Sequence, residues 1–216
     1  FKRAGLGGVQ NFQIGGHLQA LADDPSVQIG NAKWRELMRF AMDECGRLGL
    51  TFGTHNCPGW SSSAAPSVKV EDSMQKLVWT EMKISGAAKV SLKIDPPKVD
   101  AKWNYYRDIA VLALPDRPDV PLESVIDLTA KVDANGMLNW DAPAGPWVIL
   151  RFGHTTNGRT NVEQAPPSGV GLECDKMSRA AVERYWKDYP SMLLDLAGKN
   201  AGTSFTRVEI DSYEAG

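Results

Sequence analysis

The stretch NAKWRELMRFAMDECGRLGLTFGT, residues 31–54, joins a helical pattern to a strand-like pattern at a single glycine. Asn31 is placed to cap a helix over residues 32–48, and Gly49 is placed to end it in the left-handed conformation. Apolar residues recur at three- and four-residue steps, as on one face of a helix: Trp34, Leu37, Met38, Ala41, Cys45 and Leu48. A strand is expected at residues 50–54.

The neighbouring segments extend this pattern. Residues 7–14 (GGVQNFQI) read as a short strand before the helix. A strand, a helix and a second strand with short links are typical of a parallel sheet. A further helix is expected after the capping residue Ser178, where Pro190 should kink it or split it in two. Its apolar face is Val182, Tyr185, Trp186, Tyr189, Leu193 and Leu196, and a strand over residues 206–210 follows.

The middle of the chain has a different texture. Residues 89–94 alternate polar and apolar side chains, as a half-buried strand does, and further strand-like runs follow at residues 108–114, 125–128 and 147–152. Prolines and the turn-forming pair Asn135-Gly136 punctuate them. We therefore expect a compact antiparallel β-module here.

The element order predicts an α/β fold, a partial (β/α)8 TIM-like barrel with an inserted antiparallel β-domain. Residues 1–74 would form the first part of the barrel, residues 75–158 the inserted domain, and residues 159–216 the continuation of the barrel. In such barrels the chemistry sits at the carboxyl ends of the strands.

Composition narrows the class of partner. The chain has 216 residues, of which 43% are hydrophobic and 23% charged, and a net charge of −2, so nothing favours nucleic acid or an acidic membrane surface. No apolar run approaches the length of about 18 residues that a membrane helix needs. Three cysteines without CxxC spacing make a zinc knuckle improbable and forbid full disulfide pairing.

The first candidate site follows the strand over residues 50–54, in the stretch HNCPGWSSS. Trp60 suits the apolar face of a sugar, while His55 and Asn56 suit its hydroxyl groups. The alternative is a loop tryptophan that caps the barrel, with His55 bonded to backbone. The run GWSSS lacks the GxSxG pattern of a nucleophile elbow, so a serine hydrolase with Ser61 as nucleophile is excluded.

Two further segments carry carboxylates. GLECDK offers Glu173, Asp175 and Lys176 just before a helix, where acidic residues often only complement the helix dipole. Asp211 and Glu214 end the last strand, and two neighbouring carboxylates can hold their protons with different affinities, so that one serves as an acid. A glycosidase needs such an acid to protonate the leaving oxygen. Ordinary solvated acids on a surface loop are the alternative.

Several long stretches, in order along the chain, resemble the glycoside hydrolase family 106 enzymes, the α-L-rhamnosidases: AGLGGVQ, HNCPGWSSS, EDSMQKLVW, YYRDIAVLALP, LRFGHTTNGRTN, GLECDKMS and EIDSYE. The resemblance implies a barrel enzyme that hydrolyses terminal α-L-rhamnosyl linkages with inversion. The family's catalytic acid matches Glu214. Substrate-site residues implied in the same way are Asn56, Trp60, Glu173, Asp175 and Lys176. His55 and Asp211 join them as candidates because they follow strand ends.

The resemblance carries further expectations. It implies calcium at the sugar site, with oxygen ligands of the kind Glu173, Asp175 and Asp211 supply, although the ligands cannot be assigned one by one. It also implies a rhamnose-containing glycoside as substrate and a bacterial enzyme that is periplasmic or secreted. The family's catalytic base lies downstream of the DSYE motif, so we expect the remaining barrel segments of a parent chain to supply it.

Two other functions stay open at this point. One is a carbohydrate-binding protein that keeps the pocket and lacks the base. The other is a glycosidase of different sugar specificity, because a sequence does not measure the shape of a pocket.

Overall fold

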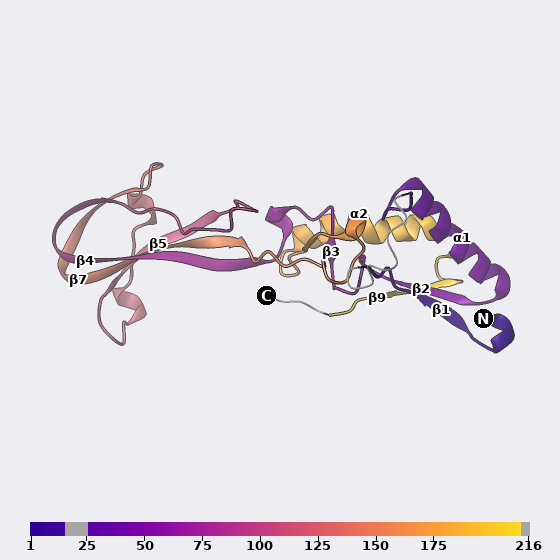
Figure 1. Ribbon diagram of the computed structural model, residues 1–216. Helices are drawn as coiled ribbons and strands as arrows, with labels where there is room; N and C mark the ends of the chain where they lie inside the picture. Colours follow the sequence, from indigo (N-terminus) through magenta and orange to yellow (C-terminus); the bar gives the residue numbers. More distant parts are fainter. Residues whose placement is uncertain (16–25, 213–216) are drawn as a thin grey trace. The chain divides into compact units, whose positions relative to one another are not determined.

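The computed structural model describes residues 1–15 and 26–212 (Figure 1). The chain divides into two compact units. Residues 1–74 and 157–216 form the first, which we call the helical unit, and residues 75–156 form the second, the β unit. Each unit has its own cluster of buried apolar side chains.

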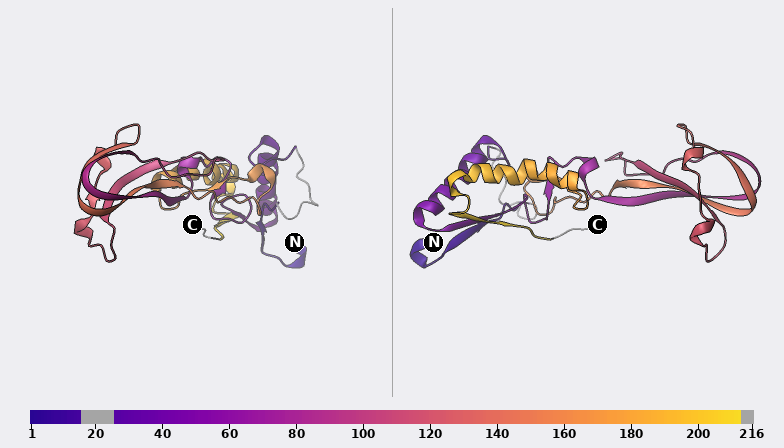
Figure 2. Two further views of the ribbon diagram at one scale, coloured as in Figure 1. Left: turned by 60° about the vertical axis from the view of Figure 1, so that its left-hand side comes forward. Right: turned by 180° about the vertical axis from the view of Figure 1, so that it is seen from behind.

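The helical unit is built on a three-stranded parallel sheet in the order β1-β2-β9. The strands are β1 (Gly8–Asn11), β2 (Thr51–His55) and β9 (Phe205–Glu209). Helices α1 (Ala32–Leu48) and α2 (Arg179–Ala197) lie together on one face of this sheet, as Figures 1 and 2 show. The parallel pairing of β1 with β2 confirms the strand-helix-strand prediction.

Helix α1 begins and ends where the sequence predicts. The side-chain oxygen of Asn31 accepts a hydrogen bond from the amide of Trp34 at 2.9 Å, and Gly49 adopts the left-handed conformation with φ 63°. The residues that face the core are Trp34, Met38, Met42 and Cys45. The prediction was wrong for Leu37, which is 44% exposed, while Met42 is fully buried.

Helix α2 is continuous, so the expectation that Pro190 could split it was wrong. Its first turn is capped by Ser178, whose hydroxyl accepts from the amide of Ala181 at 3.3 Å. The apolar face holds the helix on the core in spite of the proline: Tyr185, Tyr189, Pro190, Leu193 and Leu196 are all buried. Val182 and Trp186, predicted for the same face, are partly exposed.

Short elements complete both units. A two-stranded antiparallel sheet joins β3 (Ala64–Ala65) to β8 (Leu172–Glu173). The 3₁₀ helices are η1 (Lys2–Ala4), η3 (Val70–Asp72), η4 (Leu122–Ser124), η5 (Thr129–Lys131), η6 (Pro167–Gly169) and η7 (Gly198–Asn200). In the part of the chain that the structure describes, no helix is long and apolar enough to cross a membrane.

The β unit is a four-stranded antiparallel sheet in the order β4-β7-β5-β6. Its strands are β4 (Gln75–Lys93), β7 (Met137–Thr156), β5 (Arg107–Pro115) and β6 (Ile126–Asp127). The antiparallel prediction is confirmed, but β4 and β7 run for 19 and 20 residues, far beyond the short strands expected. Figure 2 shows them as one long twisted ribbon.

Alternating side chains explain why β7 holds its register. Leu138, Trp140 and Ala142 are buried, while Asn139 and Asp141 between them are exposed. The core that they join also contains Trp147, whose ring meets that of Trp140 edge to face at a centroid distance of 5.4 Å. A one-residue slip would expose this entire set, so the hydrophobic pattern fixes the pairing.

The chain enters the β unit after Met74 and returns to the helical unit at Asn157, and these two residues lie side by side. The amide of Asn157 donates a hydrogen bond to the carbonyl of Met74 at 2.8 Å. The first strand pair of the β unit, Gln75 opposite Thr156, follows directly. The two crossings are therefore held side by side by backbone pairing.

Asn161 joins the two loops that carry the candidate site. Its fully buried amide nitrogen donates to the carbonyls of Pro58 at 2.9 Å and Gly169 at 3.1 Å. Its amide oxygen accepts from the backbone amide of Gly171 at 2.9 Å. Every polar atom of this side chain is thus used to pair backbone groups that would otherwise be buried without partners.

We predict that Asn161→Ala destabilises the helical unit by about 3 kcal/mol, because it leaves three backbone groups without this partner. Thermal unfolding of the purified protein measures the loss as a lower midpoint. Asn139→Ala, at an exposed position of β7, is the matched control and should stay within about 0.5 kcal/mol of the parent. Equal midpoints for the two variants would contradict the role of Asn161.

Candidate functional site

The candidate site begins where β2 and β9 end. The two strands are parallel neighbours, and His55 lies opposite Glu209 in their register. The next residue, Asn56, donates its backbone amide to the carbonyl of Glu209 at 3.0 Å. The loops that follow both strands therefore start from the same edge of the sheet.

His55 is buried to 1% exposure against Phe12, with ring centroids 4.2 Å apart. Neither ring nitrogen has a hydrogen-bond partner among the residues that the structure describes. Burial lowers the pKa of His55, although the negative charges of Glu209 and Asp211 partly oppose this effect. The imidazole is therefore held in its neutral form near neutral pH.

Asn56 holds its own loop together. Its side-chain amide donates to the carbonyl of Ser62, and its backbone carbonyl accepts a hydrogen bond from the hydroxyl of Tyr185 on α2. The side-chain oxygen of Asn56 is buried and has no partner within residues 1–15 and 26–212. The side chain of Asn56, which the sequence predicts to bind substrate, thus uses its nitrogen to hold the loop. Its oxygen remains without a partner among the described residues.

Cys57 also ties the loop together and is not a nucleophile. Its thiol donates to the carbonyl of Ser61 at 2.8 Å, and burial raises its pKa to about 12, so the thiolate does not form at neutral pH. Cys45, Cys57 and Cys174 are all buried and free of disulfides. The hydroxyl of Ser61 accepts from the backbone amide of Ala64 at 3.3 Å.

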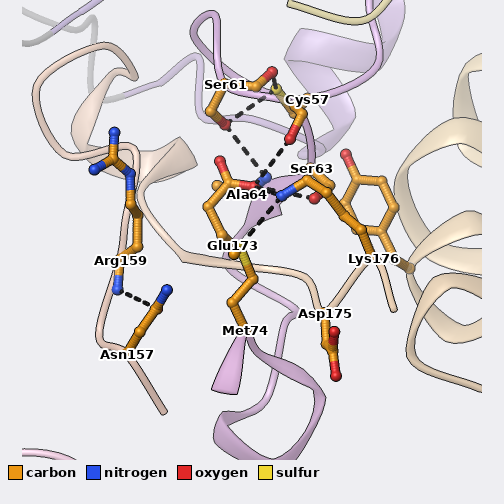
Figure 3. Close-up of polar contacts among 12 residues, drawn as sticks. Cys57, Ser61, Ser63, Ala64, Met74, Asn157, Arg159, Glu173, Asp175 and Lys176 are labelled. Carbon is orange, nitrogen blue, oxygen red and sulfur yellow. Dashed lines mark hydrogen bonds and ion pairs between the residues drawn. The ribbon is translucent and has the colours of Figure 1, made fainter. Parts of the chain in front are cut away.

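Glu173 forms the charged centre of the site. Strand β8 carries it beside β3, and its side chain is only 1% exposed. One oxygen, Oε2, accepts from the hydroxyl of Ser63 at 3.0 Å, from that of Ser62 at 3.4 Å and from the ammonium of Lys176 at 2.9 Å. Figure 3 shows Ser63 and Lys176 beside Glu173. Glu173 and Lys176 thus form a buried ion pair completed by two serines.

A small pocket opens beside this cluster. It is lined by Trp60, Ser61, Arg159, Thr160, Gln164, Glu173 and Ser212. The second oxygen of Glu173, Oε1, is buried and has no hydrogen-bond partner among the described residues. The pocket therefore combines an aromatic ring, a guanidinium group and a carboxylate, with hydroxyl and amide groups between them.

Lys176 and Asp175, the charged residues that follow Glu173 in the sequence, have different surroundings. The ammonium of Lys176 also contacts the sulfur of Met74 at 3.4 Å, and its side chain is 10% exposed. The carboxylate of Asp175 accepts from the backbone amide of Met177 at 2.9 Å, near the start of α2. In Figure 3 the carboxylates of Asp175 and Glu173 point in different directions. This hydrogen bond closes a turn ahead of α2, whose first turn contains no acidic residue.

At the end of the described chain, Asp211 is half-buried and accepts from the hydroxyl of Ser212 at 3.1 Å. Ser212 adopts a positive φ of 51° and lines the pocket. Glu214, the expected catalytic acid, lies outside the described residues. It follows Ser212 by two positions in the sequence.

The described residues do not form the calcium site that the resemblance implies. Within residues 1–15 and 26–212 there is no cluster of three or more histidine, cysteine, aspartate or glutamate side chains that could hold a metal ion. Of the three oxygen ligands suggested by the sequence, Glu173 is engaged by Lys176 and two serines, while Asp175 is engaged by backbone. We therefore assign no metal ligand within residues 1–15 and 26–212.

Sequence reasoning missed part of the pocket. Arg159, Thr160 and Gln164 follow β7 in a polar loop that has no recognisable catalytic spacing. The sequence suggests no role for Ser62 and Ser63, whereas both donate to Glu173. The polar run TNGRTN is the one signal near Arg159, and it gives that residue no specific role.

Comparison with known proteins places this site in a family. The Glyco_hydro_106 model, described as alpha-L-rhamnosidase, matches residues 1–110 and 99–216. The structure of a rhamnosidase from Novosphingobium sp. PP1Y superposes with a TM-score of 0.75 over 98% of this chain and 36% of that chain. Sequence identity is 20%, so this likeness shows the fold.

A curated relative from Formosa agariphila (strain DSM 15362 / KCTC 12365 / LMG 23005 / KMM 3901 / M-2Alg 35-1), named "Putative beta-glucuronidase", is 37% identical over 215 residues. The match covers 85% of this chain and 18% of the relative, so the chain spans about a fifth of that protein's length. Since the family model matches the chain from its first residue to its last, the chain belongs to glycoside hydrolase family 106.

Proposed function

We propose that the protein carrying this chain is a glycoside hydrolase that removes terminal α-L-rhamnosyl groups with inversion of configuration. One observation carries the proposal: a chain of this family has a pocket lined by Trp60, Arg159 and a buried Glu173. An aromatic ring beside fixed polar groups suits a sugar, which has an apolar face and a rim of hydroxyl groups.

The fold supports the proposed location of the chemistry. Trp60 and Ser61 follow β2, and Ser212 follows β9, so pocket residues come from the carboxyl ends of parallel strands. Active sites of (β/α)8 barrels are built at that end. We take the sheet β1-β2-β9 to be part of such a barrel, completed by other segments of the parent protein.

The proposed mechanism gives each group one task. Trp60 packs on the apolar face of the sugar. Glu214 protonates the leaving oxygen. An inverting enzyme also needs a second carboxylate about 6.5–9.5 Å from the acid, with the attacking water between them. We assign that base to the parent protein and not to a residue of this chain.

A second sugar class is favoured by a specific observation. The relative at 37% identity is named a beta-glucuronidase, and the pocket contains Arg159. A guanidinium group pairs well with a carboxylate such as that of a uronic acid. A carbohydrate-binding protein without hydrolytic activity is the third possibility, which the sequence also left open.

Parallel assays of the full-length protein separate these functions. We expect hydrolysis of an aryl α-L-rhamnoside and no comparable hydrolysis of an aryl β-D-glucuronide, with release of the inverted sugar detected by NMR. Turnover of the glucuronide alone would replace the rhamnosidase proposal by the second sugar class. Binding of rhamnose without turnover of either substrate would identify a binding protein.

Glu214→Gln in the full-length protein should lower kcat/KM on a rhamnoside with a poor leaving group by about 10²–10⁴-fold, because general acid catalysis is typically worth that much. An activated aryl leaving group needs less protonation and should lose less. Steady-state kinetics on the two substrates measures the difference. Equal and small losses on both would remove Glu214 from the role of acid.

The control for Glu214→Gln is Asp127→Asn in the β unit. The carboxylate of Asp127 is exposed and accepts from the backbone amide of Thr129 at 2.8 Å, a bond that an asparagine oxygen can also accept. The turnover of Asp127→Asn should stay within a few-fold of that of the parent protein. A loss as large as that for Glu214 would mean that the catalytic centre lies elsewhere.

Calcium dependence remains a prediction that comes from the family resemblance. Exhaustive chelation should abolish activity of the full-length protein, and calcium should restore it better than magnesium, because calcium takes more oxygen ligands in a more flexible geometry and sheds its water more readily. The check is an activity assay before chelation, after it and after each metal is added back. Full activity after chelation would contradict the prediction.

A further inference from the structure

The two oxygens of the Glu173 carboxylate have opposite surroundings. Oε2 accepts from the hydroxyls of Ser62 and Ser63 and from the ammonium of Lys176. Oε1 is equally buried, yet no donor reaches it among the residues that the structure describes. A buried acceptor without a donor costs free energy, so native proteins rarely keep one without a role.

Glu173 lies beside the pocket. It lines the pocket together with Trp60, Arg159 and Ser212, although its side chain is only 1% exposed. A ligand in this pocket would therefore lie next to the carboxylate. The pocket carries both an apolar surface for a ring and polar groups at its rim, the combination expected for a ligand with hydroxyl groups.

The cluster fixes the carboxylate before any ligand arrives. Three donors hold Oε2, and the strand pair β3-β8 places Glu173 opposite Ala64, the residue that follows Ser63. Asn161 ties the loop after β2 to the loop before β8. The unused oxygen is thus a preorganised acceptor, which does not have to be ordered when the ligand binds.

We infer that Oε1 of Glu173 accepts a hydrogen bond from one hydroxyl group of the bound sugar, and that this contact makes Glu173 a specificity-determining residue. A carboxylate only accepts hydrogen bonds, so the site selects a neutral donor at that position of the sugar and repels an anion there. The inference rests on the proposed function in that it takes the ligand to be a glycoside.

The chemistry of a glutamine substitution makes the inference testable. In Glu173→Gln the amide oxygen should occupy the place of Oε2, because three donors require an acceptor there. The amide nitrogen then replaces Oε1 and turns the acceptor toward the sugar into a donor. Glu163→Gln is the matched control, since Glu163 is exposed in the same region and does not line the pocket.

The experiment measures binding of methyl α-L-rhamnoside and its 2-, 3- and 4-deoxy derivatives to the full-length protein by calorimetry, with kcat/KM for the matching aryl glycosides. We expect the parent and Glu163→Gln to bind one deoxy sugar about 10- to 100-fold more weakly than the complete sugar, as for a hydrogen bond to a charged group. Glu173→Gln should lose affinity for the complete sugar and none for that deoxy sugar.

A uniform loss across the whole series in Glu173→Gln would overturn the inference, because a purely structural role affects every sugar alike. If thermal unfolding shows that Glu173→Gln is unstable, the affinities of the parent protein for the deoxy sugars are the test. Equal affinity of the parent for all the deoxy sugars would overturn the inference. Failure of the proposed function looks different. If the protein binds the rhamnosides selectively and through Glu173 but does not hydrolyse them, the proposed hydrolase activity is wrong and the inference stands. Binding of methyl β-D-glucuronide in place of the rhamnosides would identify a protein that recognises uronic acids.

Discussion

The buried amide of Asn161 is the contact on which the pocket depends. It pairs backbone groups from the loop after β2 and from the segment that leads into β8, two regions far apart in the sequence. Trp60 and Ser61 come from the first region and Glu173 from the second. Without a shared partner these loops would have to bury unpaired carbonyls and amides, which is unfavourable. Together with the pairing of β3 and β8, these bonds bring the two halves of the charged cluster around Glu173 together.

Local signals made much of the helical unit predictable. The cap at Asn31 and the glycine at position 49 bracket α1 because both act through backbone geometry within a few residues. The parallel pairing of β1 and β2 follows from the intervening helix. Leu37 and Met42 show the limit of such reasoning. A helical wheel gives the apolar face, but the neighbouring elements decide which edge of that face they cover.

Features that depend on distant residues could not be predicted. Pro190 stays inside a continuous helix because its neighbours are buried in the core, and the packing outweighs the lost backbone bond. The roles of Ser62 and Ser63 become visible only when β8 brings Glu173 beside them. The loop with Arg159 has no spacing that indicates chemistry, so its place in the pocket is a property of the fold.

The adjacent crossings at Met74 and Asn157 have a consequence for how the chain folds. Strands β2 and β9 of the helical unit precede and follow the β unit in the sequence, so their pairing closes a long loop. Closing such a loop costs entropy that grows with its length. The β unit pairs its own ends, Gln75 with Thr156, through a continuous antiparallel ladder. Once that ladder has formed, the effective loop between β2 and β9 becomes shorter by the length of the β unit. The order of events in which the inserted unit forms first thus lowers the entropic barrier to assembling the sheet that carries the pocket.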